Sequence, residues 1–139
     1  MGLVALSVAS CDVGGDSESR VPMAIRVTPG GDVEFVLCTT RQIESVGADY
    51  AATPGQWETF WDFTGSVAIR ADTPVDEAVL RSEFSGDATR PEFKGGGAIL
   101  IALDGPSSND SLLGVYLLPE GADGAMWIQS DESQTETPC

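Results

Sequence analysis

The side chains that could perform acid–base chemistry in this chain are carboxylates, because the sequence contains no histidine. Ser-His-Asp and Cys-His catalysis are therefore excluded, and so is the commonest zinc ligand. Glu58 and Asp62 lie close together in the sequence and could form the carboxylate pair that hydrolyses glycosides. They sit in a surface-type alternation without a further catalytic companion. A carboxylate-based hydrolase is therefore the weakest of our hypotheses, and we predict that the protein is not an enzyme.

Two other segments contain groups that bind ions or phosphates in other proteins. Asp104, Asn109 and Asp110 offer oxygen ligands for calcium, but their spacing is not that of an EF-hand, which favours a solvated turn. The glycine run 95–97 lacks the Gly-Lys-Ser/Thr ending of a phosphate-binding loop. It also precedes an apolar segment, whereas that loop follows a strand. We predict no metal site and no cofactor, and expect the glycines to serve strand entry.

Trp57 and Trp127 are the residues that we predict to contact a ligand or a partner. Trp57 begins a strand after a Pro-Gly turn, and Trp127 alternates with Met126 and Ile128, which predicts that it faces outward. Exposed aromatic rings stack on sugars or anchor protein interfaces. Core packing is the alternative for Trp127, it is favoured over contact for Trp57, and it is the expectation for Trp61. The other rings that could join such a face are Tyr50 and Tyr116.

The first eleven residues combine a short apolar run with small residues and a cysteine. The run 3–9 is too short to cross a bilayer, which takes about 20 apolar residues. Val8-Ala9-Ser10-Cys11 resembles the lipobox of bacterial lipoproteins, which is an aliphatic residue, two small residues and an obligatory cysteine. The resemblance implies a signal over 1–10, a lipid on Cys11 and a place on the outer face of the plasma membrane. A buried Cys11 in an ordinary first strand and a plain cleaved signal remain open.

The segments around this cysteine predict how the anchor works. No Lys or Arg precedes Arg20, so the usual basic start of a signal is missing, which suggests that the true leader is longer. Residues 11–21 are rich in Gly, Ser and Asp and lack periodicity, so we expect a flexible tether. Two or more acyl chains give stable attachment, whereas one chain gives only marginal binding.

The chain contains three cysteines, an odd number. If Cys11 carries a lipid, Cys38 and Cys139 remain, and an even pair in an oxidising compartment predicts a disulfide. The bond would hold a terminus that otherwise frays. It would close a loop of about 100 residues, which contributes about 4–5 kcal/mol in the chain-entropy model. Two unpaired thiols are the alternative.

The formal net charge of −15 restricts the partners of the protein. Such a surface repels nucleic-acid phosphates and anionic lipid headgroups, which are bound through Lys and Arg. We therefore predict no nucleic-acid partner, and membrane attachment only through the covalent lipid on Cys11. An envelope protein or glycan remains as the partner.

Apolar alternation and turn residues predict a mainly β domain over 22–139, with 16 glycines and 8 prolines. Thr73 and Pro74 predict the start of one short helix near 74–84, with an irregular loop plus a strand as the alternative. We expect seven or eight strands in an antiparallel β-sandwich, with a barrel-like closure left open. The expected strands are 21–28 and 33–38, which form a hairpin, then 41–50, 57–64, 66–71, the buried central strand 98–103, 112–118 and 126–128. We expect a loop over 86–94, a hairpin turn at Asp123-Gly124 and a polar tail over 130–139.

This layout, with a cysteine at the sheet and a terminal Thr137-Pro138-Cys139, resembles the small β-rich lipoproteins of unknown function of high-GC Gram-positive bacteria. The resemblance implies no activity. We predict a lipid-anchored, extracytoplasmic β-sandwich that acts as a non-enzymatic interaction or accessory module. The alternative is a module that binds envelope glycans or small ligands through exposed tryptophans.

Overall fold

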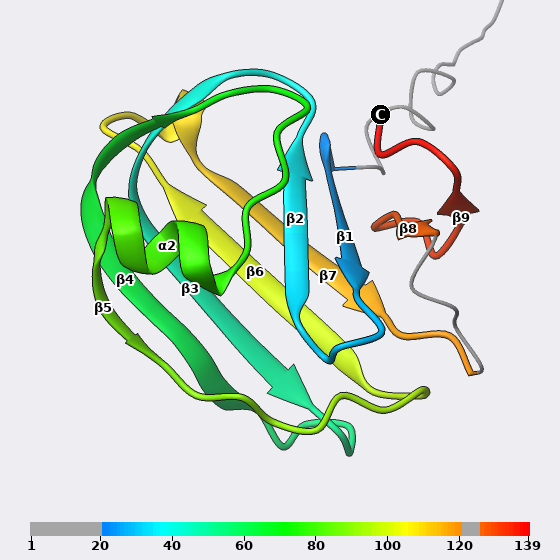
Figure 1. Ribbon diagram of the computed structural model, residues 1–139. Helices are drawn as coiled ribbons and strands as arrows, with labels where there is room; N and C mark the ends of the chain where they lie inside the picture. The colour runs from blue at the N-terminus through cyan, green and yellow to red at the C-terminus, as the bar shows by residue number, and fades with distance from the viewer. Residues whose placement is uncertain (1–20, 121–125) are drawn as a thin grey trace, which may run out of the picture.

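The computed structural model describes residues 21–120 and 126–139 (Figure 1). The lipobox, Cys11 and the tether fall within 1–20, and the predicted Asp123-Gly124 turn falls within 121–125. These predictions therefore lie outside the described residues.

Two antiparallel sheets face each other across one hydrophobic core, as a β-sandwich (Figure 1). The two sheets end in separate edge strands, so the domain is not a closed barrel. The small sheet has the order β2-β1-β8-β9, with β1 Met23–Val27, β2 Val33–Leu37, β8 Trp127–Ile128 and β9 Gln134–Thr135. The large sheet has the order β5-β4-β3-β6-β7, with β3 Arg41–Ala51, β4 Glu58–Ile69, β5 Ser85–Ala88, β6 Ala98–Asp104 and β7 Leu112–Leu117.

The described residues form nine strands, where the sequence predicted seven or eight. The predicted strands 57–64 and 66–71 are one strand, β4, which has a register shift opposite β3 beside Gly65. Strand β5 lies where part of a loop was predicted, because its exposed residues carry no apolar alternation. Strand β9 lies in the predicted polar tail, and a short 3-10 helix, η2, spans Ser108–Asp110.

The α-helix found among the described residues is shorter than predicted and begins later. It is α2, Glu77–Glu83, and its N-cap is Asp76, whose carboxylate accepts a hydrogen bond from Val79 N–H at 3.0 Å. The predicted cap at Thr73 is wrong. Val75 instead exchanges two hydrogen bonds of 2.9 Å with Phe35 of β2, which holds the chain extended up to the cap.

The glycine run serves strand entry, as predicted. A Cβ atom on Gly97 would lie 2.8 Å from the ring of Tyr50, so only glycine lets β6 begin at this position. Gly96 has a φ of +88°, a left-handed conformation that side chains disfavour. β6 then runs between β3 and β7 as the central strand that its continuous apolar sequence predicted.

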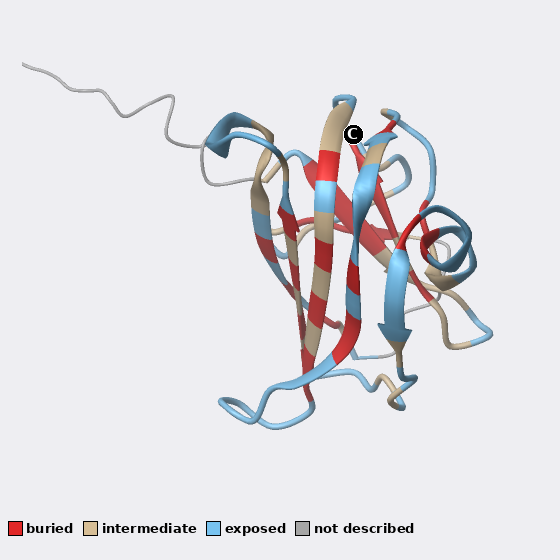
Figure 2. Cartoon of the chain, turned by 90° about the vertical axis from the view of Figure 1, so that its left-hand side faces the viewer, coloured by how far each residue is buried: buried red, intermediate tan, exposed pale blue. Residues whose placement is uncertain are grey.

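Alternating burial along the strands places one face of each sheet in the core (Figure 2). The two sheets are also joined by a buried hydrogen bond, because Tyr116 Oη of β7 donates to the carbonyl oxygen of Met23 in β1 at 2.8 Å. Burial raises the pKa of this hydroxyl well above its usual range, so the phenol remains a donor.

The C-terminus is fixed to the small sheet. Cys38 and Cys139 form the predicted disulfide, with their Cα atoms 5.6 Å apart. The buried Gln129 donates from its side-chain nitrogen to the Pro138 carbonyl oxygen at 2.7 Å. The described chain starts beside this segment, because Val21 N–H donates to Ser130 Oγ at 2.8 Å. The final residues are therefore an ordered part of the fold, in contrast to the predicted tail.

Candidate functional site

Each sheet of a sandwich ends in two edge strands, whose outer backbone groups can pair with another chain unless they are covered. Three of the four edges here are covered or very short. Residue Val75 pairs with β2, β5 is only four residues long and follows directly after α2, and β9 is only two residues long beside the disulfide. Arg81 of α2 also donates to the Ala88 carbonyl of β5 at 3.4 Å.

The fourth edge, β7, is open. Leu118 N–H donates to the Gly97 carbonyl oxygen, which fixes the register of β7 against β6. In an antiparallel pair every second residue bonds to the neighbouring strand, so the even-numbered residues of β7 bond to β6. The backbone groups of Leu113, Val115 and Leu117 point away from β6. Within the described chain they have no hydrogen-bond partner. The strand L-L-G-V-Y-L contains no charge and no proline, which are the usual protections of an edge.

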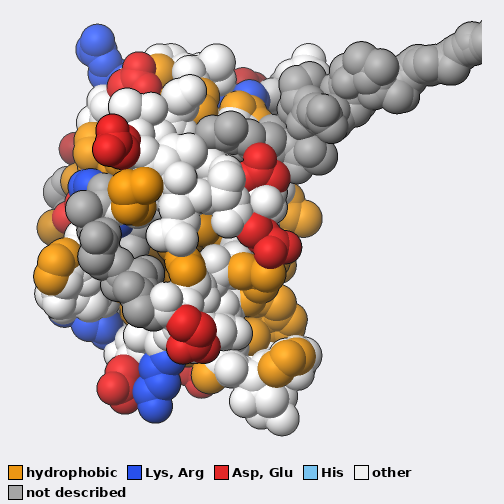
Figure 3. Space-filling model, turned by 90° about the vertical axis from the view of Figure 1, so that its right-hand side faces the viewer, with side chains coloured by type: hydrophobic (Ala, Val, Ile, Leu, Met, Phe, Trp, Pro, Cys, Tyr) orange, Lys and Arg blue, Asp and Glu red, His pale blue; other side chains and the backbone are white. Residues whose placement is uncertain are grey.

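The same three residues also form an apolar stripe on the outer face of the large sheet. The exposed fractions are 59% for Leu113, 44% for Val115 and 46% for Leu117. Figure 3 shows hydrophobic side chains gathered along the right-hand margin of the molecule, on the side that carries β7. We call the stripe together with the unpaired backbone groups the β7 surface. Its half-buried neighbours on β6, by register, are Ala98, Leu100 and Ala102.

Trp57 and Trp127, the predicted contact residues, have different outcomes. Trp57 is 42% exposed in the turn before β4, as the prediction required. The prediction that Trp127 is exposed is wrong, because only 5% of its surface is accessible. It does point away from Ile128 and the main core, but it packs in a second cluster with Ala24 and Val36.

An ionic contact completes the cover over Trp127. The guanidinium of Arg26 lies 4.2 Å from the centre of the indole ring, and it is paired with Glu34 at 2.6 Å. A cation over an aromatic face is attracted by the ring electrons. The sequence alternation correctly predicted that the Trp127 side chain points away from the main core. It could not show that Arg26 covers the ring.

The remaining aromatic candidates are buried. Tyr50 accepts a hydrogen bond from the Lys94 backbone N–H at 2.9 Å, and Tyr116 holds the two sheets together. Trp61 is also buried, as expected. The five rings therefore form no common face, and Trp57 alone is exposed.

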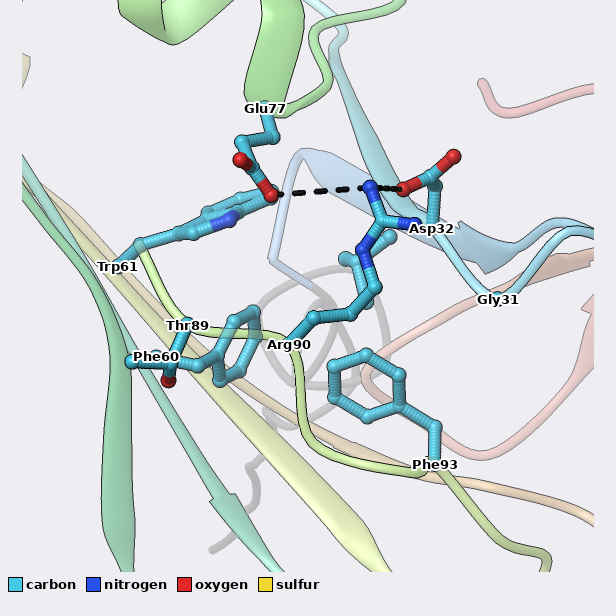
Figure 4. Close-up of a pocket in the computed structure, with 9 residues that line it drawn as sticks. Gly31, Asp32, Phe60, Trp61, Glu77, Thr89, Arg90 and Phe93 are labelled. Atoms are coloured by element: carbon cyan, nitrogen blue, oxygen red, sulfur yellow. Dashed lines mark ion pairs between the residues drawn. The ribbon is translucent and has the colours of Figure 1, made fainter. Parts of the chain in front are cut away.

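Figure 4 shows a small pocket at the junction of three segments. Arg90 lies between Asp32 at 2.6 Å and Glu77 at 3.9 Å, above the rings of Phe60 and Phe93. The free space is about 10 Å³, room for no more than one water molecule. Because two carboxylates already pair with the Arg90 guanidinium, we interpret this pocket as a structural ion-pair cluster that joins the three segments.

The predicted carboxylate pair is not the one that the fold brings together. Asp62 is paired across the ladder with Asp87 of β5, and both are exposed beside a shallow hollow of about 140 Å³. Glu58 does not line that hollow. Sequence reasoning missed Asp87 because its segment was predicted to be a loop.

Two of the three calcium-type side chains accept hydrogen bonds, one from β3 and one from within the loop. Asp104 accepts from Ser45 Oγ at 3.1 Å, and Asp110 accepts from Ser107 Oγ at 3.1 Å. Over residues 21–120 and 126–139, no group of three Cys, Asp or Glu side chains is placed to hold a metal ion. The helices in these ranges are all too short or too polar to cross a membrane.

No family model, no curated protein and no solved structure matches the chain. What the β7 surface can bind therefore follows from its own geometry and charge. The sequence signal for it was the run 112–118, which is apolar at both odd and even positions. We interpreted that run only as an apolar strand, since the neighbours of a strand are not visible in its sequence.

Proposed function

We propose that this protein is a non-enzymatic interaction module whose partner, a protein of the cell envelope, docks on the β7 surface. The observation that carries the proposal is the β7 edge, which no element of the described residues covers and which also carries three exposed apolar side chains. Contiguous exposed apolar surface on a folded domain commonly marks a site of interaction. Full burial of a Leu or Val side chain contributes about 1.5–3 kcal/mol.

We also propose that the module is lipid-anchored through Cys11 on the outer face of the plasma membrane. The disulfide between Cys38 and Cys139 supports an oxidising compartment. The described residues begin at Val21, and Cys38 N–H donates to the Pro22 carbonyl oxygen at 3.0 Å, so an anchor before Val21 would attach the domain at its disulfide-bonded end. The β7 surface runs along the side of the sandwich, so a tethered domain would leave it accessible (Figure 1).

Two other functions have less support. Glycan binding was proposed to use two exposed tryptophans. Trp127 is buried, so Trp57 is the one of the two that could contact a sugar. A carboxylate-based hydrolase would have to use Asp62 and Asp87, which face each other across β4 and β5. Such cross-strand neighbours have Cβ atoms about 5 Å apart, in the range of retaining glycosidases. Their hollow is shallow and lacks a further polar group besides Thr59 and Thr89.

The docking proposal is tested by photo-crosslinking in the envelope of the native host. A photoreactive residue replaces Val115 on β7 or, as the matched control, the exposed Thr64 on β4 of the same sheet. We expect a discrete crosslinked species from position 115 and none from position 64. Absence of a species at 115, or equal crosslinking at both positions, would refute docking on β7.

The anchor is tested separately by the intact mass of the membrane fraction, with and without Cys11→Ala. We expect a chain that starts at Cys11 with a diacylglycerol-sized mass gain, and loss of that gain in the variant. An unmodified chain that keeps Met1 in the soluble fraction would refute the anchor and leave the docking proposal to its own test.

A further inference from the structure

We propose that the occupant of the β7 surface is an extended, positively charged segment of the partner, which adds a strand to the large sheet. This inference rests on the proposed function and names the chemistry of the partner. It follows from the direction of the free backbone groups, from the charge around β7, and from a mismatch that disfavours a second copy of this chain.

The free groups of β7 are arranged for strand addition. Leu113, Val115 and Leu117 each present an N–H and a C=O along the edge, and the same residues present their side chains on the outer face. A partner strand can therefore form main-chain hydrogen bonds and apolar contacts with the same three residues. Main-chain bonds of this kind give affinity, and the alternate side chains give specificity.

Most of the charged side chains near β7 are acidic, and the nearest cation is Arg41 of β3, which donates to the Asn109 carbonyl oxygen at 2.6 Å just before the strand. The segment 95–139 contains seven acidic residues and no Lys or Arg. Asp104 lies at the end of β6 and Glu120 lies beyond β7, and both are exposed. The ion pairs among the described residues all lie between residues 26 and 94, so neither carboxylate has a cationic partner there. A basic partner would supply the missing charge and associate faster.

A second copy of this chain fits the edge poorly. Two β7 strands pair antiparallel with most overlap when Val115 faces its own copy, because only odd-numbered residues have free groups. The same register carries Asp110 of one chain toward Glu120 of the other, at both ends of the pair. Like charges directly opposite destabilise such a pairing. The net charge of −15 on each chain adds repulsion.

The matching segment is therefore apolar at three alternate positions and cationic at both ends. The probe is a fluorescein-labelled peptide with the order Lys-Thr-Val-Thr-Val-Thr-Val-Thr-Lys, and the control peptide has Glu in place of both Lys. Binding to the full chain is measured by fluorescence anisotropy at low and high salt. We expect the Lys peptide to bind at least about tenfold more tightly than the Glu peptide, with a difference that shrinks as salt screens the charges.

Variants of the chain identify the edge as the place of binding. Val115→Pro removes an N–H that points away from β6, so it leaves the ladder intact, as proline on an edge strand does. We expect it to weaken the Lys peptide about tenfold or more, while Val115→Ile retains binding. Glu120→Gln together with Asp104→Asn is expected to reduce the preference for Lys over Glu, and far-UV circular dichroism verifies the fold of each variant.

The outcomes separate this inference from the docking proposal. Equal affinity for both peptides, no binding of either, or binding that survives Val115→Pro would overturn the basic-strand partner. A doubled mass in sedimentation equilibrium that Val115→Pro returns to the monomer would assign the edge to a second copy. In each of these cases crosslinking from position 115 still decides whether β7 is a docking surface.

Discussion

The two edges of the large sheet differ in cover and in composition. The β5 edge is only four residues long and follows directly after the helix α2, and the outer face beside it carries the opposed carboxylates Asp62 and Asp87. At β7 no element of the described chain covers the edge, and the outer face carries leucine and valine. Figure 2, which looks at the α2 side, shows the mostly exposed strand β5 beside the helix.

The exposed apolar edge at β7 is therefore not a general property of the edges in this small sandwich. Among the described residues, the other three edges are shorter or are covered in part: β5 has four residues, Val75 pairs with β2, and β9 has two residues beside the disulfide. Proteins usually protect an edge because an open one pairs with other chains. An edge that combines free backbone groups with apolar side chains is therefore best explained by a partner that covers it.

The largest effect is expected where a covered edge loses its covalent support. Replacement of both Cys38 and Cys139 by alanine should lower the free energy of unfolding by about 4 kcal/mol, since the bond closes a loop of about 100 residues. Guanidinium denaturation of the variant and the parent measures the difference. A loss below about 1 kcal/mol would mean that the terminus is held by β9 and Gln129 without the bond.

Removal of the apolar contact that docks α2 should make the β5 edge resemble β7. Leu80 is fully buried under the helix, so Leu80→Ala should cost about 3 kcal/mol of unfolding free energy. Val79→Ala, at an exposed position of the same helix, serves as the control and should change stability by less than about 0.5 kcal/mol. Urea denaturation distinguishes them, and equal losses would show that α2 is not anchored by Leu80.

A smaller effect is expected at the start of α2. Asp76→Ala removes the carboxylate that caps Val79 N–H and should lower stability by about 1 kcal/mol. Thr73→Ala should have little effect, because its hydroxyl makes only a long contact of 3.4 Å with the Ala71 carbonyl. Thermal unfolding of both variants compares the observed cap with the one predicted from the sequence. A larger loss from Thr73→Ala would contradict the cap at Asp76.

The smallest effect on stability is expected at the open edge itself. Leu113→Thr and Leu117→Thr replace exposed side chains with a residue that favours strands, so the free energy of unfolding should change by less than about 0.5 kcal/mol. Crosslinking from position 115 should nevertheless decrease, because the apolar stripe is interrupted. A loss of several kcal/mol would show that these leucines support the fold, and that the β7 surface is structural.

Much of the architecture was predictable from local pattern. The period-two alternation around Ile25 and Phe35 predicted the first hairpin, the glycines before Ala98 predicted strand entry, and the cysteine count predicted the disulfide. These features depend on residues that are near in sequence or on simple counting. The strands that were missed, β5 and β9, are short and polar, and they form because a neighbouring strand offers hydrogen bonds.

The site was less predictable, for a related reason. Burial of Trp127 depends on Arg26 and on small residues of β1 and β2, about a hundred residues away in the chain. The openness of β7 depends on which strands fail to lie beside it. Neither property is encoded in the local alternation that was available, whereas the apolar content of 112–118 was visible.

Amide hydrogen exchange of the free, full-length chain tests most directly whether β7 is an open edge. An open edge predicts an alternation along the strand: the amides of Leu113, Val115 and Leu117 exchange rapidly, while those of Leu112, Gly114 and Tyr116 exchange at least about 100-fold more slowly. Uniform protection of all six amides in the monomer would show that the edge is already paired, and would refute an open β7.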